Sequence, residues 1–129
     1  MKTSRSGPGR VTVDEAAERT GFGREDKAAG HVEASLVLDV REPGEWQAGH
    51  VPGAVHIPLA ELSEGIPLPT RAQERPLIVI CRSGNRSRRA AELLTARGAK
   101  AVDVIGGMLE WAEAGLPVVD SQGLRGTVA

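Results

Sequence analysis

Aromatic residues and cysteine are almost absent from this chain of 129 residues. Aromatics make up 2% of it and tyrosine is missing, so a platform that stacks the bases of single-stranded nucleic acid is hard to build. The net charge of −1 adds no general attraction to nucleic acid or membranes, and we expect neither as a partner. Cys81 is the only cysteine, which excludes an internal disulfide and a CxxC metal or redox site.

Long apolar runs are missing as well. The longest aliphatic run, residues 77–80, is far shorter than the roughly 20 residues of a membrane-spanning helix. Residues 1–10 are polar and rich in Gly, Ser and basic residues, and they lack the apolar stretch of a secretory signal. We expect them to form a flexible N-terminal tail. These features predict a soluble, cytoplasmic protein.

Short β-branched runs alternate with helical stretches along the rest of the chain. We expect strands at residues 11–13, 35–40, 54–57, 76–80 and 101–105. We expect helices at residues 14–19, from 42–43 onward, and at 59–62, 87–97 and 108–114. The alternation predicts one α/β domain with a mostly parallel central sheet. In such sheets, active sites lie at the carboxyl ends of the strands.

Positive charge is concentrated around the only cysteine. Residues 75–97 carry a net charge of +5, so the remainder of the chain carries −6. Arg88 and Arg89 fall in the first turn of a predicted helix, where each cation is unfavourable by about 0.3–1 kcal/mol. An anionic ligand or a nearby acid would offset this effect. The alternative is a solvated helix face that also includes Arg97.

Residues 81–87, Cys-Arg-Ser-Gly-Asn-Arg-Ser, join a buried strand to the longest predicted helix. Such a turn can direct several backbone N–H groups, and the positive end of the helix dipole, at one place. Gly84 and Asn85 tolerate the left-handed backbone that this requires, and Arg82 and Arg86 add positive charges. The thiol is therefore expected to be a reactive thiolate beside an anion pocket. The alternative is that this cysteine is an inert core residue.

Several segments together resemble the rhodanese family. They are residues 38–42 with Trp46, residues 49–58, residues 78–87, residues 106–111 and residues 115–118. Their order and spacing match the pattern of that family over nearly the whole chain. The resemblance implies a rhodanese-like three-layer domain at residues 11–119, with helices on both faces of the sheet, followed by a C-terminal tail at residues 120–129.

The resemblance also implies a thiosulfate sulfurtransferase with Cys81 as its catalytic nucleophile. The thiolate takes sulfur from a small anionic donor, carries it as a persulfide and passes it to cyanide, a thiol or a protein. No metal and no organic cofactor is required. The other loop residues are expected to bind the donor and the persulfide: Arg82, Ser83, Gly84, Asn85, Arg86 and Ser87. Asp39 and Arg41 are expected to support the site, and His50 and His56 to be structural.

Other functions are compatible with the sequence. A persulfide carrier that serves a partner protein, or a regulatory binding module, would share the same loop. A cysteine-dependent phosphatase or an arsenate reductase of the same fold is a weaker alternative. The related phosphatases use Cys-x5-Arg, whereas only four residues separate Cys81 from Arg86. Arg82 and Ser83 match neither the thiosulfate-preferring nor the mercaptopyruvate-preferring enzymes, so the natural donor is open.

Overall fold

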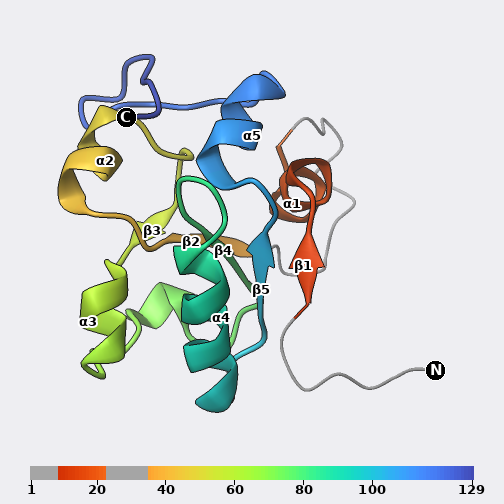
Figure 1. Cartoon of the computed structure of the whole chain (residues 1–129), viewed down its shortest axis with the longest axis vertical. Helices are drawn as coiled ribbons and strands as arrows, with labels where there is room; N and C mark the ends of the chain where they lie inside the picture. The colour runs from red at the N-terminus through yellow and green to blue at the C-terminus, as the bar shows by residue number, and fades with distance from the viewer. Residues whose placement is uncertain (1–8, 23–34) are drawn as a thin grey trace.

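The computed structural model describes residues 9–22 and 35–129, and its centre is a five-stranded sheet with the order β1-β5-β4-β2-β3 (Figure 1). The strands are β1 (Arg10–Val11), β2 (Leu36–Asp39), β3 (Val55–His56), β4 (Leu77–Ile80) and β5 (Ala101–Val104). Every strand pairing in the described residues is parallel, and β4 lies between β2 and β5. The prediction of a mostly parallel sheet is therefore confirmed.

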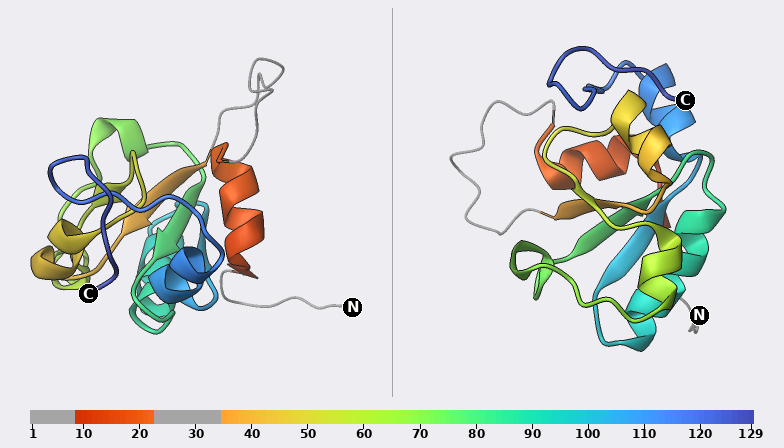
Figure 2. Two further views of the ribbon diagram at one scale, coloured as in Figure 1. Left: turned by 90° about the horizontal axis from the view of Figure 1, so that it is seen from above. Right: turned by 90° about the vertical axis from the view of Figure 1, so that its left-hand side faces the viewer.

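Helices cover both faces of this sheet, as predicted (Figure 2). They are α1 (Val13–Thr20), α2 (Pro43–Ala48), α3 (Leu59–Ser63), the 3-10 helix η2 (Thr70–Ala72), α4 (Arg86–Ala96) and α5 (Gly107–Glu113). The helices α1 and α5 contact each other over one face, and α3 and α4 contact each other over the opposite face. Within the described residues, no helix is long and apolar enough to cross a membrane.

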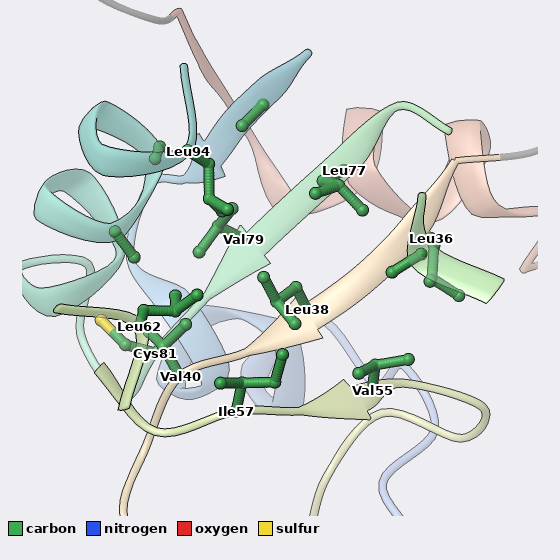
Figure 3. Close-up of a cluster of buried hydrophobic side chains, with 14 residues drawn as sticks. Leu36, Leu38, Val40, Val55, Ile57, Leu62, Leu77, Val79, Cys81 and Leu94 are labelled. Atoms are coloured by element: carbon green, nitrogen blue, oxygen red, sulfur yellow. The ribbon is translucent and has the colours of Figure 1, made fainter. Parts of the chain in front are cut away.

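The alternation of side chains along the strands creates two buried layers, one on each face. Leu38 and Val79 belong to the layer under α3 and α4, and this layer extends to Cys81 (Figure 3). Ile78 and Trp111 belong to the layer under α1 and α5. All five side chains are at most 1% exposed. Because β4 is buried on both faces, its sequence is a continuous apolar run rather than an alternating one.

The helix N-termini differ in how their free N–H groups are satisfied. At α1, the N–H of Glu15 donates to Thr12 Oγ1 (3.1 Å) and the N–H of Thr12 donates to Glu15 Oε1 (2.9 Å). At α2, Glu45 accepts the N–H of Glu42 (2.9 Å). At α4, the residue before the helix, Asn85, makes no side-chain cap. The first N–H groups of α4 are therefore free to bind an acceptor outside the helix.

The two predicted tails differ in how far the structure describes them. Residues 1–8 lie outside the described residues. Residues 120–129 pass close to α2, where the N–H of Thr127 donates to the Ala48 carbonyl (2.9 Å). The boundaries of the domain stay a prediction.

Candidate active site

Cys81 lies directly after β4, at the carboxyl end of the central strand. It continues the alternation of Leu77 and Val79, so its side chain enters the buried layer under α4 (Figure 3). The residue is 1% exposed. It therefore has the burial of a core cysteine, while its sulfur faces polar groups of the loop that follows.

Residues 81–87, which we call the Cys81 loop, surround this sulfur. The backbone N–H of Gly84 donates to Cys81 Sγ at 3.1 Å, and the N–H of Ser87 donates to it at 3.3 Å. Gly84 has a φ of +106°, in the left-handed region expected for the loop, whereas Asn85 is right-handed with a φ of −89°. Two N–H donors, one of them from the first turn of α4, favour the thiolate form of the sulfur.

The Cys81 loop rests on the N-terminus of α5. The N–H of Met108 donates to the Cys81 carbonyl (2.7 Å), and the N–H of Leu109 donates to the Arg82 carbonyl (3.0 Å). A Cβ atom on Gly107 would lie 2.4 Å from the Cys81 carbonyl oxygen, so this close approach requires glycine. These contacts fix the backbone at the start of the loop and thereby the position of the sulfur.

Arg86 is joined to α2 by a bidentate ion pair. Its Nη1 and Nη2 atoms donate to Glu45 Oε1 (2.8 Å) and Oε2 (2.9 Å). The hydrogen bond from Arg86 lowers the pKa of Glu45 from 4.5 to about 2, although burial acts in the opposite direction. Glu45 in turn raises the pKa of Arg86. The sequence predicts that Arg86 binds the donor, whereas in the structure its guanidinium ties the Cys81 loop to α2.

The remaining polar residues of the loop are exposed: Arg82, Ser83 and Asn85. Arg82 Nε donates to the carbonyl oxygen of Ala129 at 2.9 Å. Since Arg86 is only half-exposed and paired, Arg82 is the loop arginine more accessible to a dissolved anion.

A buried polar network runs from the sulfur to β5 and β1. Cys81 Sγ lies 3.4 Å from Ser87 Oγ, which lies 3.1 Å from Asp103 Oδ2. Arg10 donates from Nε to Asp103 Oδ1 (3.0 Å) and from Nη2 to Asp103 Oδ2 (3.1 Å). Ser87 is 0% exposed and Asp103 is 2% exposed. Asp103 and Arg10 are not among the predicted site residues, although a carboxylate inside an apolar strand indicates a buried partner.

The predicted supporting pair is buried at the end of β2. Arg41 donates to Asp39 Oδ2 from Nη2 (2.8 Å) and to Asp39 Oδ1 from Nε (2.9 Å), and Nη2 also donates to the Gly49 carbonyl (2.6 Å). Both side chains are 0% exposed. These contacts hold the chain between β2 and the end of α2 together, and they involve no residue of the Cys81 loop.

The two histidines outside the loop stack on Trp46. The ring centroids lie 3.5 Å apart for His50 and 4.7 Å apart for His56. His50 Nδ1 donates to the Trp46 carbonyl and His56 Nε2 donates to the Arg41 carbonyl, each at 2.7 Å. These backbone partners agree with a structural role. In the part of the chain that the structure describes, no group of three His, Cys, Asp or Glu side chains could hold a metal ion.

Comparison with known proteins gives a family match and similar structures. A family model described as a rhodanese-like domain matches residues 24–114, which include the whole Cys81 loop and Asp103. The crystal structure of a rhodanese-related protein from Thermoplasma volcanium superposes with a TM-score of 0.67 at 33% identity. It covers 86% of this chain and 97% of that one.

Two curated relatives carry names that refer to sulfur. The putative sulfur carrier protein YrkF of Bacillus subtilis is 39% identical over 84 residues, 61% of this chain and 42% of that protein. A sulfurtransferase of Allochromatium vinosum is 33% identical over 89 residues, 68% of this chain and 81% of that protein. The chain thus spans less than half the length of YrkF, and other curated relatives are matched over only 19% and 50% of their length.

Proposed function

This chain belongs to the family of rhodanese-like domains, and on that premise we propose that it is a sulfurtransferase that works through a Cys81 persulfide. The observation that carries the proposal is the convergence of two N–H groups on Cys81 Sγ, from Gly84 at 3.1 Å and Ser87 at 3.3 Å. Such donors stabilise negative charge on a nucleophile held at the end of a rigid strand. The names of the Bacillus and Allochromatium relatives support the same chemistry.

In the first half-reaction, the Cys81 thiolate attacks the outer sulfur of an anionic donor such as thiosulfate. A bond forms between Sγ and that sulfur, the sulfur–sulfur bond of the donor breaks, and its electron pair leaves with sulfite. The negative charge that began on Sγ now lies on the outer sulfur of the persulfide. The backbone N–H groups of the Cys81 loop are already oriented to stabilise this charge without reorganisation.

In the second half-reaction, an acceptor attacks the outer sulfur of the persulfide. Cyanide, a small thiol or a protein thiol forms a bond to this sulfur, and the bond to Sγ breaks with its electron pair returning to Sγ. Cys81 is again a thiolate, held by the same N–H groups. Dividing one difficult transfer between two steps is the general advantage of covalent catalysis. No metal or organic cofactor takes part in either step.

The two arginines of the loop have different proposed roles. Arg82 is exposed and belongs to the positive segment at residues 75–97, so it attracts the anionic donor. Arg86 acts through Glu45, because their ion pair fixes the Cys81 loop against α2. Whether thiosulfate is the natural donor depends on the part of the loop that contains Arg82 and the neighbouring Ser83.

The burial of Cys81 restricts the acceptor. Since the residue is only 1% exposed, its sulfur is reached by a small molecule or by a narrow, extended group after a local movement of the covering side chains. Such burial protects a persulfide from unspecific thiols in solution. The name of the Bacillus relative, a putative sulfur carrier, favours a protein as the second class of acceptor.

The Arg86–Glu45 pair argues against a phosphatase. A phosphate bound in the Cys81 loop would need an arginine that donates two N–H groups to its oxygens. Both outer nitrogens of Arg86 already donate to Glu45, and the low pKa of about 2 keeps Glu45 ionised at neutral pH. The spacing of four residues between Cys81 and Arg86 supports the same conclusion.

The proposal is tested by the formation of thiocyanate from thiosulfate and cyanide. We expect measurable turnover by the wild-type chain and none by Cys81→Ser, because serine cannot carry the sulfane sulfur. Ser83→Ala is the matched control: it changes an exposed hydroxyl of the same loop and leaves the nucleophile in place. Equal turnover by the wild type and Cys81→Ser would overturn the proposal, and so would hydrolysis of an aryl phosphate that depends on Cys81.

A further inference from the structure

The single hydroxyl proton of Ser87 has two neighbours that can accept it. Ser87 Oγ lies 3.1 Å from Asp103 Oδ2 and 3.4 Å from Cys81 Sγ. A guanidinium can only donate hydrogen bonds, and Arg10 donates to both oxygens of Asp103. Asp103 is therefore present as a carboxylate without a proton to give. It follows that Ser87 must donate to Asp103 and presents only a lone pair to the sulfur.

This arrangement suits a protonated thiol, which can donate to Ser87 Oγ, but it does not suit a thiolate. When Cys81 ionises, rotation of the Ser87 hydroxyl about its Cβ–Oγ bond brings its proton to Sγ. Asp103 then still accepts the two N–H groups of Arg10 and is not left unsatisfied.

We propose that the Ser87 hydroxyl is a two-position donor that follows the charge on Cys81 Sγ, and that Asp103, held by Arg10, is the positioning residue that accepts this hydroxyl whenever Sγ is uncharged. Asp103 thus competes with the thiolate for one proton and thereby sets the balance between thiol and thiolate. The rotation transfers no proton between residues, so it needs no additional base or acid.

The role in turnover rests on the proposed function. In the free thiolate, and again when Sγ leaves from the persulfide, the Ser87 hydroxyl donates to Sγ. In the persulfide, the charge lies on the outer sulfur, so the hydroxyl returns to Asp103. Ser87 is 0% exposed, and without Asp103 its hydroxyl would have to find another acceptor in a buried site.

Other charges around the sulfur are separable from this effect. The charged side chains on the elements packed around Cys81 are Arg82 and Arg86 in the loop, Glu45 on α2, Arg10 on β1 and Asp103 on β5. Arg86 is paired with Glu45, and Arg82 is exposed. Asp103 differs from all of them because a printed hydrogen bond connects it to the residue that contacts Sγ.

The test is an ultraviolet titration of the thiolate in wild type, Ser87→Ala, Asp103→Asn and the double variant. The chain has one cysteine and no tyrosine, so the thiolate signal is read without interference from tyrosinate, and Cys81→Ser is the blank. We expect Asp103→Asn to lower the midpoint by about one pH unit, because Ser87 then donates to the sulfur in both states. In the Ser87→Ala background, we expect this shift to be smaller by at least about half a pH unit.

An equal shift from Asp103→Asn in both backgrounds would overturn the proposal, since it would reflect long-range charge alone. An unchanged midpoint in Asp103→Asn would also overturn it. Asp14→Asn, at an exposed position on α1, makes the same change of net charge and is expected to leave the midpoint unchanged. If Asp103→Asn fails to fold, Arg10→Gln replaces it: Asp103 then holds the hydroxyl more strongly and the midpoint rises, again less in Ser87→Ala.

The titration needs no sulfur donor. Failure of sulfur transfer with an intact coupling between Ser87 and Asp103 would therefore contradict the proposed function alone. Normal transfer without the coupling would contradict the positioning role alone.

Discussion

Two buried aspartates flank the central strand and have different roles. Asp39 on β2 is paired in register with Ile80, and Asp103 on β5 is paired in register with Val79, so both lie near the carboxyl end of β4. Each is at most 2% exposed, and each forms an ion pair with an arginine. Only Asp103 is connected by hydrogen bonds to Cys81.

The alternation of side chains explains this difference. Ile80 belongs to the layer under α1 and α5, and Asp39 shares its face of the sheet. Val79 and Cys81 belong to the layer under α3 and α4, and Asp103 shares that face. The same side chain one step along the pleat therefore serves either the scaffold or the chemistry.

The comparison predicts its largest effect on stability at Asp39. Asp39→Asn leaves the charge of Arg41 buried at 0% exposure without a counter-ion, and Arg41 Nη1 already has no hydrogen-bond partner among the described residues. We expect a loss of about 3–5 kcal/mol in the free energy of unfolding, measured by urea denaturation. The midpoint of the Cys81 thiolate titration should stay at its wild-type value.

Asp103→Asn is the matched variant on the other face. Arg10 is 35% exposed and can turn to water when its partner is lost, so we expect a smaller loss of about 1–3 kcal/mol. Equal losses of stability in the two variants, or a shifted thiolate midpoint in Asp39→Asn, would remove the distinction between scaffold and chemistry.

A smaller effect is expected at the third ion pair, which holds the Cys81 loop on α2. The pKa of Glu45 is lowered from 4.5 to about 2 by Arg86, so the pair stabilises the fold fully above pH 4.5 and is lost as the pH falls towards 2. Glu45→Gln should cost about 1–2 kcal/mol at pH 7, less than the pKa shift implies, because water screens this half-exposed pair.

The measurement is urea denaturation at a series of pH values between 7 and the acid limit of folding. The difference between wild type and Glu45→Gln should shrink as the pH falls below 4.5. Glu113→Gln, at an exposed position near the end of α5, is the control and should follow the wild type. A difference that stays constant with pH would mean that the Arg86–Glu45 pair does not fix the loop.

Much of the fold could be predicted from the sequence. The predicted strands and helices begin and end within two residues of those observed, because they depend on local signals such as the apolar run at β4 and the turn residue Gly84. The position of Cys81 at a strand end followed from the same pattern. These features need no knowledge of which segments meet in space.

The partners of the charged side chains could not be predicted. Arg10 and Asp103 are separated by 93 positions in the sequence, and Glu45 and Arg86 by 41. No periodicity connects such pairs, since they meet only when the sheet has formed. The positive segment around Cys81 therefore suggested two free loop arginines, whereas Arg86 is bound to Glu45.

The central claim is that Cys81 itself carries the transferred sulfur. The most direct measurement is the intact mass of the protein after treatment with thiosulfate and removal of the excess. The account predicts a gain of about 32 Da, one sulfur atom, that is reversed by cyanide and absent in Cys81→Ser. No gain in the wild type, or the same gain in Cys81→Ser, would contradict it.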